Sequence, residues 1–228
     1  MGEHLKTERF YQSYWSLSGS AIPEKDHTIE ARKRLLAGGL RRLEPDRSSA
    51  SRVLDAGCGS GEFTQFIRDL GYDVEGIDIA QSAIDRARSR FSDLRFSVGS
   101  LEQGLPFSDS VFDAVWSTEV LEHLFDVHAG LAEMNRVLRP GGLLLLTTPY
   151  HGRFKNLLIA LGDFEKHYNP YISHIRFFTK RSLTKCLDRA GFSLVSCKGI
   201  GRQWPVFMSM FLVAHKTGVP GPPPQIMG

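Results

Sequence analysis

The 228-residue chain has few cysteines, little net charge and no long apolar run. Its three cysteines, Cys58, Cys186 and Cys197, form no C-x-x-C pair, and their odd number argues against a disulfide framework. A net charge of +3 is too small to indicate nucleic acid by itself. No run reaches the ~18 apolar residues of a membrane span, and the polar start has no signal-peptide core. We therefore expect a soluble, cytoplasmic protein without a membrane span.

The chain length fits one sizeable domain with an extension at each end. We expect residues 1–50 to form an N-terminal helical lid. A basic amphipathic stretch at 29–43 in it is interrupted by Gly38-Gly39, and a solvated surface helix is the alternative reading. The main domain is expected over residues 51–217, with an aromatic and histidine-rich insertion at 150–178 that caps the substrate. The proline-rich segment 218–228 is expected to be disordered.

From residue 52 onward, strand-like and helix-like segments alternate, which is typical of a parallel sheet covered by helices on both faces. Strands are predicted at 52–56, 73–78, 94–98, 111–116 and 143–148, and helices at 61–70, 81–91, 127–138 and 179–190. Two closing apolar stretches, 192–195 and 206–214, are predicted to form a hairpin-like pair. The fold class is therefore α/β, with a doubly wound sheet.

A glycine-rich segment, Val-Leu-Asp-Ala-Gly-Cys-Gly-Ser-Gly at residues 53–61, is the most informative part of the chain. Its alternating glycines indicate a strand-to-helix turn where the backbone approaches a ligand or takes a positive φ. A dinucleotide fingerprint needs a third glycine where Glu62 stands, and no G-K-[ST] of a P-loop follows. Carboxylates at Asp55 and Glu62 would repel a pyrophosphate. They suit S-adenosylmethionine (SAM), which has an ammonium, a sulfonium and no phosphate.

Asp78 ends the second predicted strand. It lies about 20 residues beyond the glycine loop, which is the spacing at which an acid binds a ribose diol in such folds. A carboxylate suits this task because it accepts two hydroxyl hydrogen bonds at once. The alternative is a solvated acid at a strand end.

Four motifs, VLDAGCGSGEFT, VEGIDIA, FDAVWSTEVLEHL and VLRPGGLLLLTTP, occur in order over roughly residues 50–150. They resemble the successive motifs of the Rossmann-like (class I) SAM-dependent methyltransferases. HIRFFTKRSLTKCLDRAGF is similar to the closing segment of the small-molecule, 3-demethylubiquinone-type O-methyltransferase branch. The resemblance implies a mostly parallel seven-stranded sheet with an antiparallel last strand. It also implies methyl transfer from SAM with S-adenosylhomocysteine as product, but it does not imply the acceptor.

The same resemblance implies a set of cofactor-binding residues, in which Cys58 is a small residue that fits a tight turn. The set is Asp55, Gly57, Cys58, Gly59, Gly61, Asp78, Ile79, Ser100, Leu101 and Thr118. One position departs from the family pattern, which usually has an acid after the third strand to accept from the adenine amino group. Ser100 stands there, and Glu102 could serve instead.

The segment Thr118-Glu119-Val120-Leu121-Glu122-His123 follows the fourth predicted strand. Its E-x-x-E-H pattern resembles the metal motif of the 3-demethylubiquinone-type enzymes, and that of small-RNA 2′-O-methyltransferases, which add a distant histidine. The implied ligands of Mg²⁺ or another divalent cation are Glu119, Glu122 and His123. Such a cation would lower the pKa of an acceptor hydroxyl. The alternative is a segment that caps a helix without binding metal.

Transfer to a hydroxyl also requires a group that accepts its proton. His174 is the first candidate, because it precedes Phe177-Phe178 where the family places acceptor-side residues; His123 and Glu119 follow. The aromatic insertion favours an oxygen of a small, partly apolar molecule as acceptor. The basic stretch keeps RNA ribose 2′-O-methylation as an alternative partner class, and a non-catalytic SAM-binding scaffold is a third reading. Nothing in the sequence indicates an oligomeric state.

Overall fold

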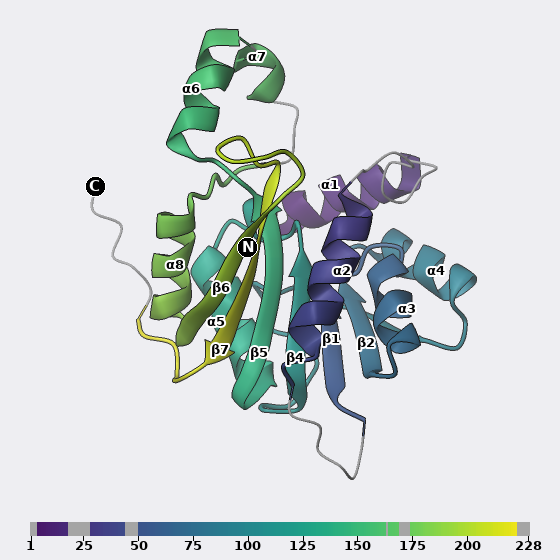
Figure 1. The fold of residues 1–228 in the computed structure, drawn as a ribbon. Coiled ribbons are helices and arrows are strands. Elements are labelled where there is room, and N and C mark those ends of the chain that lie inside the picture. Colours follow the sequence, from purple (N-terminus) through teal and green to yellow (C-terminus); the bar gives the residue numbers. More distant parts are fainter. Residues whose placement is uncertain (1–3, 18–27, 44–49, 163, 169–173, 223–228) are drawn as a thin grey trace.

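The computed structural model describes residues 4–17, 28–43, 50–162, 164–168 and 174–222 (Figure 1). The helices are α1 (His4–Leu17), α2 (Ile29–Leu40), α3 (Glu62–Asp69), α4 (Gln81–Arg90), η1 (Leu121–His123), α5 (Val127–Val137), α6 (Arg153–Gly162), α7 (Phe164–His167) and α8 (Lys180–Arg189). The strands are β1 (Arg52–Ala56), β2 (Asp73–Asp78), β3 (Arg95–Val98), β4 (Phe112–Thr118), β5 (Leu138–Pro149), β6 (Phe192–Ile200) and β7 (Ser209–Lys216).

The strands form one seven-stranded sheet in the order β3-β2-β1-β4-β5-β7-β6. The first five strands are parallel, and β7 runs antiparallel between β5 and β6. The predicted doubly wound α/β class with an antiparallel last strand is therefore confirmed. Because the strand order reverses between β1 and β4, the carboxyl ends of these two strands diverge into a crevice where ligands bind in such folds.

Two apolar layers hold the sheet, one on each face, because successive side chains of a strand point to opposite sides. On β5, Leu144 and Leu146 belong to the layer under α5 and α8. Leu143 and Leu145 belong to the layer under α2, α3 and α4. The near-continuous apolar sequence of β5 therefore reflects burial on both faces, and Figure 1 shows the helices on either side.

Helix α2 runs without a break through Gly38 and Gly39, so the predicted interruption is wrong. A Cβ added at Gly39 would overlap the side chain of Leu145 on β5, whereas Gly38 has open space around it. Glycine at position 39 therefore serves the close packing of α2 against the sheet rather than a break in the helix.

The segment 150–178 contains the helices α6 and α7, which the sequence analysis does not predict. The closing strands also run further than predicted, to Ile200 and Lys216. Part of the segment predicted to be disordered is held in place, because the Gly218 N–H donates to the Gly191 carbonyl and the Gly221 N–H to that of Arg189. Residues 223–228 lie outside the described residues. No helix among the described residues is both long and apolar enough to cross a membrane.

Candidate active site

A pocket of about 540 Å³ lies at the carboxyl ends of β1, β2 and β4, in the crevice of the doubly wound sheet. This volume is in the range of small-molecule sites. The predicted cofactor-binding residues that line it are Gly57, Cys58, Gly59, Asp78, Ile79, Ser100, Leu101 and Thr118. Asp55, near the end of β1, and Gly61, in the glycine turn, do not line the pocket. Of the predicted catalytic and metal residues, Glu119, His123 and His174 line it, and Glu122 lies behind them.

The glycine turn has the backbone conformation that its sequence predicts. Gly57, Gly59 and Gly61 have φ of 82°, 52° and 87°, where residues with a Cβ are strained. The N–H groups of Gly57 and Cys58 both donate to the Ile77 carbonyl of β2, at 2.8 and 3.0 Å. The Gly59 N–H donates to the Asp78 carboxylate at 3.0 Å. The turn is therefore fixed to the end of β2.

Three carboxylates, those of Asp55, Asp78 and Glu62, lie close enough around this turn for their charges to interact. Asp55 is fully buried; Thr64 Oγ1 donates to its Oδ2 at 2.6 Å, and its Oδ1 has no hydrogen-bond partner among the described residues. Burial raises the pKa of Asp55 to about 7, with further increases from the charges of Asp78 and Glu62 and a lowering by Thr64. Burial also raises the pKa of Asp78, against the hydrogen bonds from the backbone N–H groups of Ala80 and Gly59.

Helix α1 covers one side of the pocket with aromatic side chains. Tyr11, Tyr14 and Trp15 line it, and a Cβ at Gly59 would lie 2.9 Å from the Trp15 ring. The helix is attached to α4, since the Ser82 N–H donates to Gln12 Oε1 at 3.0 Å and Arg86 donates to the Trp15 carbonyl at 2.7 Å. Nothing in the sequence indicates the position of these aromatic side chains over the glycine turn.

Arg32 is a site residue that the sequence analysis missed. It belongs to the basic stretch at 29–43, for which a solvated surface helix is the alternative, but its side chain is buried and lines the pocket. Its guanidinium lies 3.5 Å from the Glu119 carboxylate. The neighbouring Lys33 is half-buried, does not line the pocket and is paired with Glu30 at 3.3 Å. Arg32 and Lys33 are adjacent in the sequence, and their environments differ because they occupy different sides of α2.

Glu119 has an unusual backbone conformation for a residue with a long side chain, with φ of 53°. Its carboxylate accepts a hydrogen bond from Thr147 Oγ1 at 2.9 Å and from Ser209 Oγ at 3.4 Å, beside the ion pair with Arg32. Strain of this kind persists only where the surroundings impose it, and such residues cluster at functional sites. The partners of Glu119 come from α2, β5 and β7, which holds it at the pocket wall.

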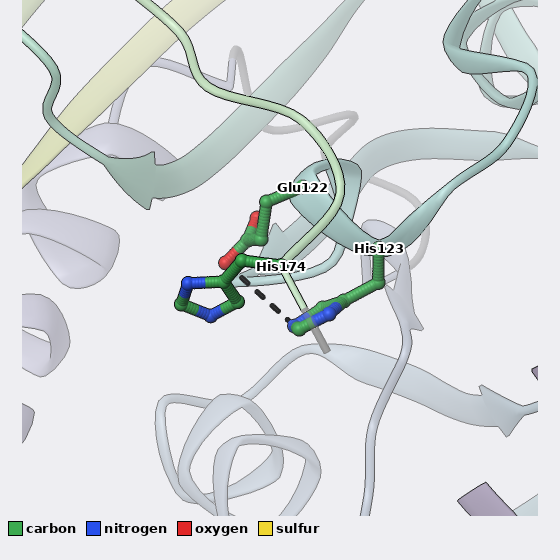
Figure 2. A group of neighbouring side chains, drawn as sticks. All are labelled: Glu122, His123 and His174. Carbon is green, nitrogen blue, oxygen red and sulfur yellow. Dashed lines mark ion pairs between the residues drawn. The ribbon is translucent and has the colours of Figure 1, made fainter. Parts of the chain in front are cut away.

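Glu122, His123 and His174 point toward one another next to the pocket (Figure 2). One ligand atom of each lies within 4.8 Å of the others, whereas Glu119 of the predicted metal set is not in this group. Glu122 is fully buried: Thr148 donates to its Oε2 at 3.1 Å, and its Oε1 has no hydrogen-bond partner among the described residues. His123 Nε2 lies 3.9 Å from that Oε1.

His174 is far from the other two in the sequence and is held there by its loop. The N–H groups of Ile175 and Arg176 both donate to the Glu122 carbonyl, at 2.9 and 3.0 Å. The rings of His123 and His174 have centroids 4.9 Å apart. Burial lowers the pKa of His174, helped by His167, and burial together with Glu119 raises the pKa of Glu122 well above its usual range. Both groups therefore favour their neutral forms.

The predicted cap contributes little to this pocket. Of the described residues in 150–178, His174 is the one that lines it. The rings of His151, His167, Tyr168 and Phe177 instead contact one another. Burial and the charge of Lys155 lower the pKa of His151 to about 4. The Phe, Tyr and Trp side chains that line the pocket thus come from α1 and, with Phe63, from α3 rather than from the insertion.

A family model described as a methyltransferase domain matches residues 28–197, which include the strands and the turn around the pocket. The chain belongs to the SAM-dependent methyltransferase family. A protein of Mycolicibacterium smegmatis named a probable S-adenosylmethionine-dependent methyltransferase is 32% identical over 154 residues, 68% of this chain and 56% of the relative. The malonyl-[acyl-carrier protein] O-methyltransferase of Salmonella typhimurium is 30% identical over 189 residues, 78% of this chain and 71% of the relative.

The chain spans about half the length of several of the methyltransferases that it matches. Among solved structures, the [4+2]-cyclase SpnF has a TM-score of 0.67 at 20% identity, covering 95% of this chain and 94% of its own. A Haloferax volcanii methyltransferase in complex with the Trm112 activator has a TM-score of 0.64 at 22% identity, covering 82% and 90%. At these identities the structures establish the fold alone.

The buried Asp55 predicts a pH dependence of stability. Its pKa is 3.8 when exposed and about 7 in the folded chain, so between these values the folded state keeps a proton that the unfolded state has lost. Stability therefore falls as pH rises through this window. Asp55→Asn keeps the acceptor for Thr64 and removes the charge. From about pH 5 to about pH 8, wild type should lose on the order of 2–3 kcal/mol relative to this variant in urea unfolding; parallel pH profiles would contradict the assignment.

Proposed function

We propose that the chain transfers a methyl group from SAM to an oxygen of a small, partly apolar molecule. The observation that carries this proposal is the composition of the pocket. One cavity joins the glycine turn and Asp78 on one side to Glu119, His123 and His174 on the other. Groups suited to hold SAM therefore face the groups suited to accept a proton across a single pocket.

The pocket fits SAM better than it fits a phosphate-bearing cofactor. A Cβ at Gly57 would overlap Val120 and one at Gly59 would crowd Trp15, so the glycines leave backbone close to the cavity. Burial raises the pKa of Asp55, and the repulsion from the charges of Asp78 and Glu62 raises it further. A cationic ligand without phosphate relieves this repulsion, and a pyrophosphate would add to it.

Asp78 and the end of β3 support the nucleoside part of the ligand. Both Asp78 oxygens accept backbone N–H bonds at 2.9–3.0 Å, and each keeps a second lone pair for a ribose hydroxyl. Ser100, Leu101 and Glu102 line the pocket next to Asp78. The Glu102 carboxylate accepts from the Asp126 N–H at 2.7 Å, which fixes the acid that can replace the family's usual one after β3.

SAM supplies a methyl group that is already activated on a sulfonium, so the chain mainly aligns the acceptor and takes up its proton. His174, with His123 beside it, is the proposed proton acceptor, and its burial favours the neutral imidazole that this role needs. Glu119, held by Arg32, shapes the wall next to them. We assign α1 and α2 as the lid that excludes water, since Tyr11, Trp15 and Arg32 line the pocket from these helices.

The relatives support oxygen as the acceptor atom, because several are named malonyl-[acyl-carrier protein] O-methyltransferases. The RNA alternative loses part of its sequence support, since Arg32 of the basic stretch faces the pocket rather than an outer surface. The unpaired state of Cys58, Cys186 and Cys197 supports our proposal of a cytoplasmic location.

The test is transfer of labelled methyl from SAM into fractionated cell extract, with SAM affinity measured by calorimetry. Wild type should label the organic-soluble fraction. Asp78→Ala should weaken SAM binding roughly 10- to 100-fold, the cost of losing a charged hydrogen-bonding group, and should abolish the label. Asp73→Ala is the matched control, because Asp73 begins the same strand at the opposite end and pairs with Arg52 and Arg95.

Each other outcome decides against part of this proposal. Label in RNA would replace the small-molecule acceptor with ribose. SAM binding without label in any fraction would support the scaffold. Equal SAM affinity of wild type and Asp78→Ala would contradict the proposed cofactor site.

As a second proposal, Glu122, His123 and His174 hold a divalent cation beside the acceptor. Their convergent ligand atoms support it, as does the Oε1 of the buried Glu122, which accepts no hydrogen bond from a described residue. One carboxylate with two imidazoles suits Mn²⁺, Fe²⁺ or Zn²⁺ better than the Mg²⁺ predicted from the sequence, since Mg²⁺ prefers oxygen ligands alone. Glu119 is engaged by Arg32 and does not belong to this set.

Removal of the cation tests this directly. After dialysis against EDTA, calorimetric titration with Mn²⁺, Zn²⁺ and Mg²⁺ should show one site per chain, and methyl transfer should return with the cation that binds. Glu122→Gln should weaken binding at least about 10-fold because one ligand loses its charge. His215→Gln, outside the pocket, is the control. Full methyl transfer in EDTA, with no cation bound, would contradict the proposed cation site. His123 and His174 would then act only as proton acceptors.

A further inference from the structure

Helix α6 presents an apolar stripe that the rest of the described chain leaves uncovered. Phe154, Leu157, Leu158 and Leu161 recur at i, i+3, i+4 and i+7, so they share one face of the helix. All four are exposed, Leu157 to 55% and Leu161 to 78%, and no residue of α6 is buried. Figure 1 shows α6 and α7 projecting beyond the end of the sheet.

The loop between β6 and β7 lies against the base of α6 and adds further exposed apolar side chains. Lys155 of α6 donates to the carbonyls of Tyr150 and Met208, at 2.8 and 3.2 Å, and the rings of Tyr150 and Phe207 have centroids 5.8 Å apart. In this loop Trp204 is 78% exposed and Met208 is also exposed. Helix α6 and the loop therefore form one edge of the molecule, which we call the α6 edge.

The charges of the α6 edge are mostly positive. Helix α6 contains no Asp or Glu, and Arg153 at its start is exposed. Arg202 is exposed in the β6–β7 loop and its charge reaches Lys155. Glu165 of α7 is exposed and is the opposing charge among the described residues, since Asp163 lies outside them. Leucine and phenylalanine on one face, an exposed tryptophan and flanking arginines form the pattern of a helix that lies in a bilayer interface.

We propose that the α6 edge binds the surface of an anionic lipid bilayer. A ten-residue helix is about 15 Å long, so its stripe is small against the ~800 Å² per partner of a stable protein interface, whereas an interfacial helix needs only to bury one face. The positive charges complement anionic headgroups. Since α6 follows the carboxyl end of β5, binding here brings the pocket edge of the sheet to the membrane. The proposal does not depend on methyl transfer.

Vesicle co-sedimentation of the full chain tests the proposal without SAM. Wild type should bind vesicles of phosphatidylcholine with about 30% phosphatidylglycerol, less strongly with phosphatidylcholine alone, and less at high salt. Leu157→Glu/Leu161→Glu should weaken binding at least about 10-fold. Val219→Glu is the matched control, since Val219 is 85% exposed and belongs to the segment after β7. Arg153→Gln/Arg202→Gln should lower affinity for anionic vesicles several-fold.

Tryptophan emission gives an independent reading of the same contact. Trp116 is buried and Trp15 lines the pocket, so a blue shift on vesicle addition should come from Trp204 and vanish in Trp204→Phe. No binding of wild type to either vesicle would overturn the proposal, as would equal binding by Leu157→Glu/Leu161→Glu. A concentration-dependent dimer that this variant abolishes, without vesicle binding, would assign the stripe to a second copy instead.

Discussion

The hydrogen bond from the Gly59 N–H to the Asp78 carboxylate joins the two segments that form the proposed cofactor side of the pocket. It fixes the turn after β1 to the end of β2, and the bonds from Gly57 and Cys58 to the Ile77 carbonyl add to it. The glycines of the attached turn have positive φ, and the side chains of Val120, Trp15 and Phe96 leave no room for a Cβ on them. Once the turn is fixed, Trp15 can close over it and Asp78 keeps its carboxylate at the cavity wall.

The cost of this arrangement is electrostatic. Asp55, Asp78 and Glu122 are buried carboxylates, and burial raises the pKa of each. Native proteins keep such groups where function requires them, because an unpaired buried charge is destabilising. In this chain the two clusters lie at opposite sides of one cavity, one suited to a cationic cofactor and one to a proton or a cation. Arg32 of α2 adds a positive charge beside the second cluster, where it pairs with Glu119.

The sequence predicted those parts of the fold and site that short motifs encode. The bounds of β1 and β2, the glycine turn and Asp78 follow from local pattern, since turn chemistry and strand alternation act within a few residues. Arg32 could not be told from Lys33, because their difference depends on which side of α2 packs on the sheet. His174 lies 52 residues after Glu122 and is brought to it by the hydrogen bonds from the next two backbone N–H groups to the Glu122 carbonyl. A contact between residues so far apart in the sequence leaves no local pattern from which it could be predicted. The spacing of α6 was visible in the sequence, but the aromatic content of the insertion favoured a cap instead.

We conclude that the glycine turn and its acids select a cationic cofactor without phosphate. Calorimetric titration of the full chain with SAM, and in parallel with NADH, checks this conclusion. We expect a single site for SAM, competed by S-adenosylhomocysteine, and no measurable binding of NADH. Binding of NADH with no binding of SAM would contradict it, because Glu62 and Asp55 would then not act against a pyrophosphate.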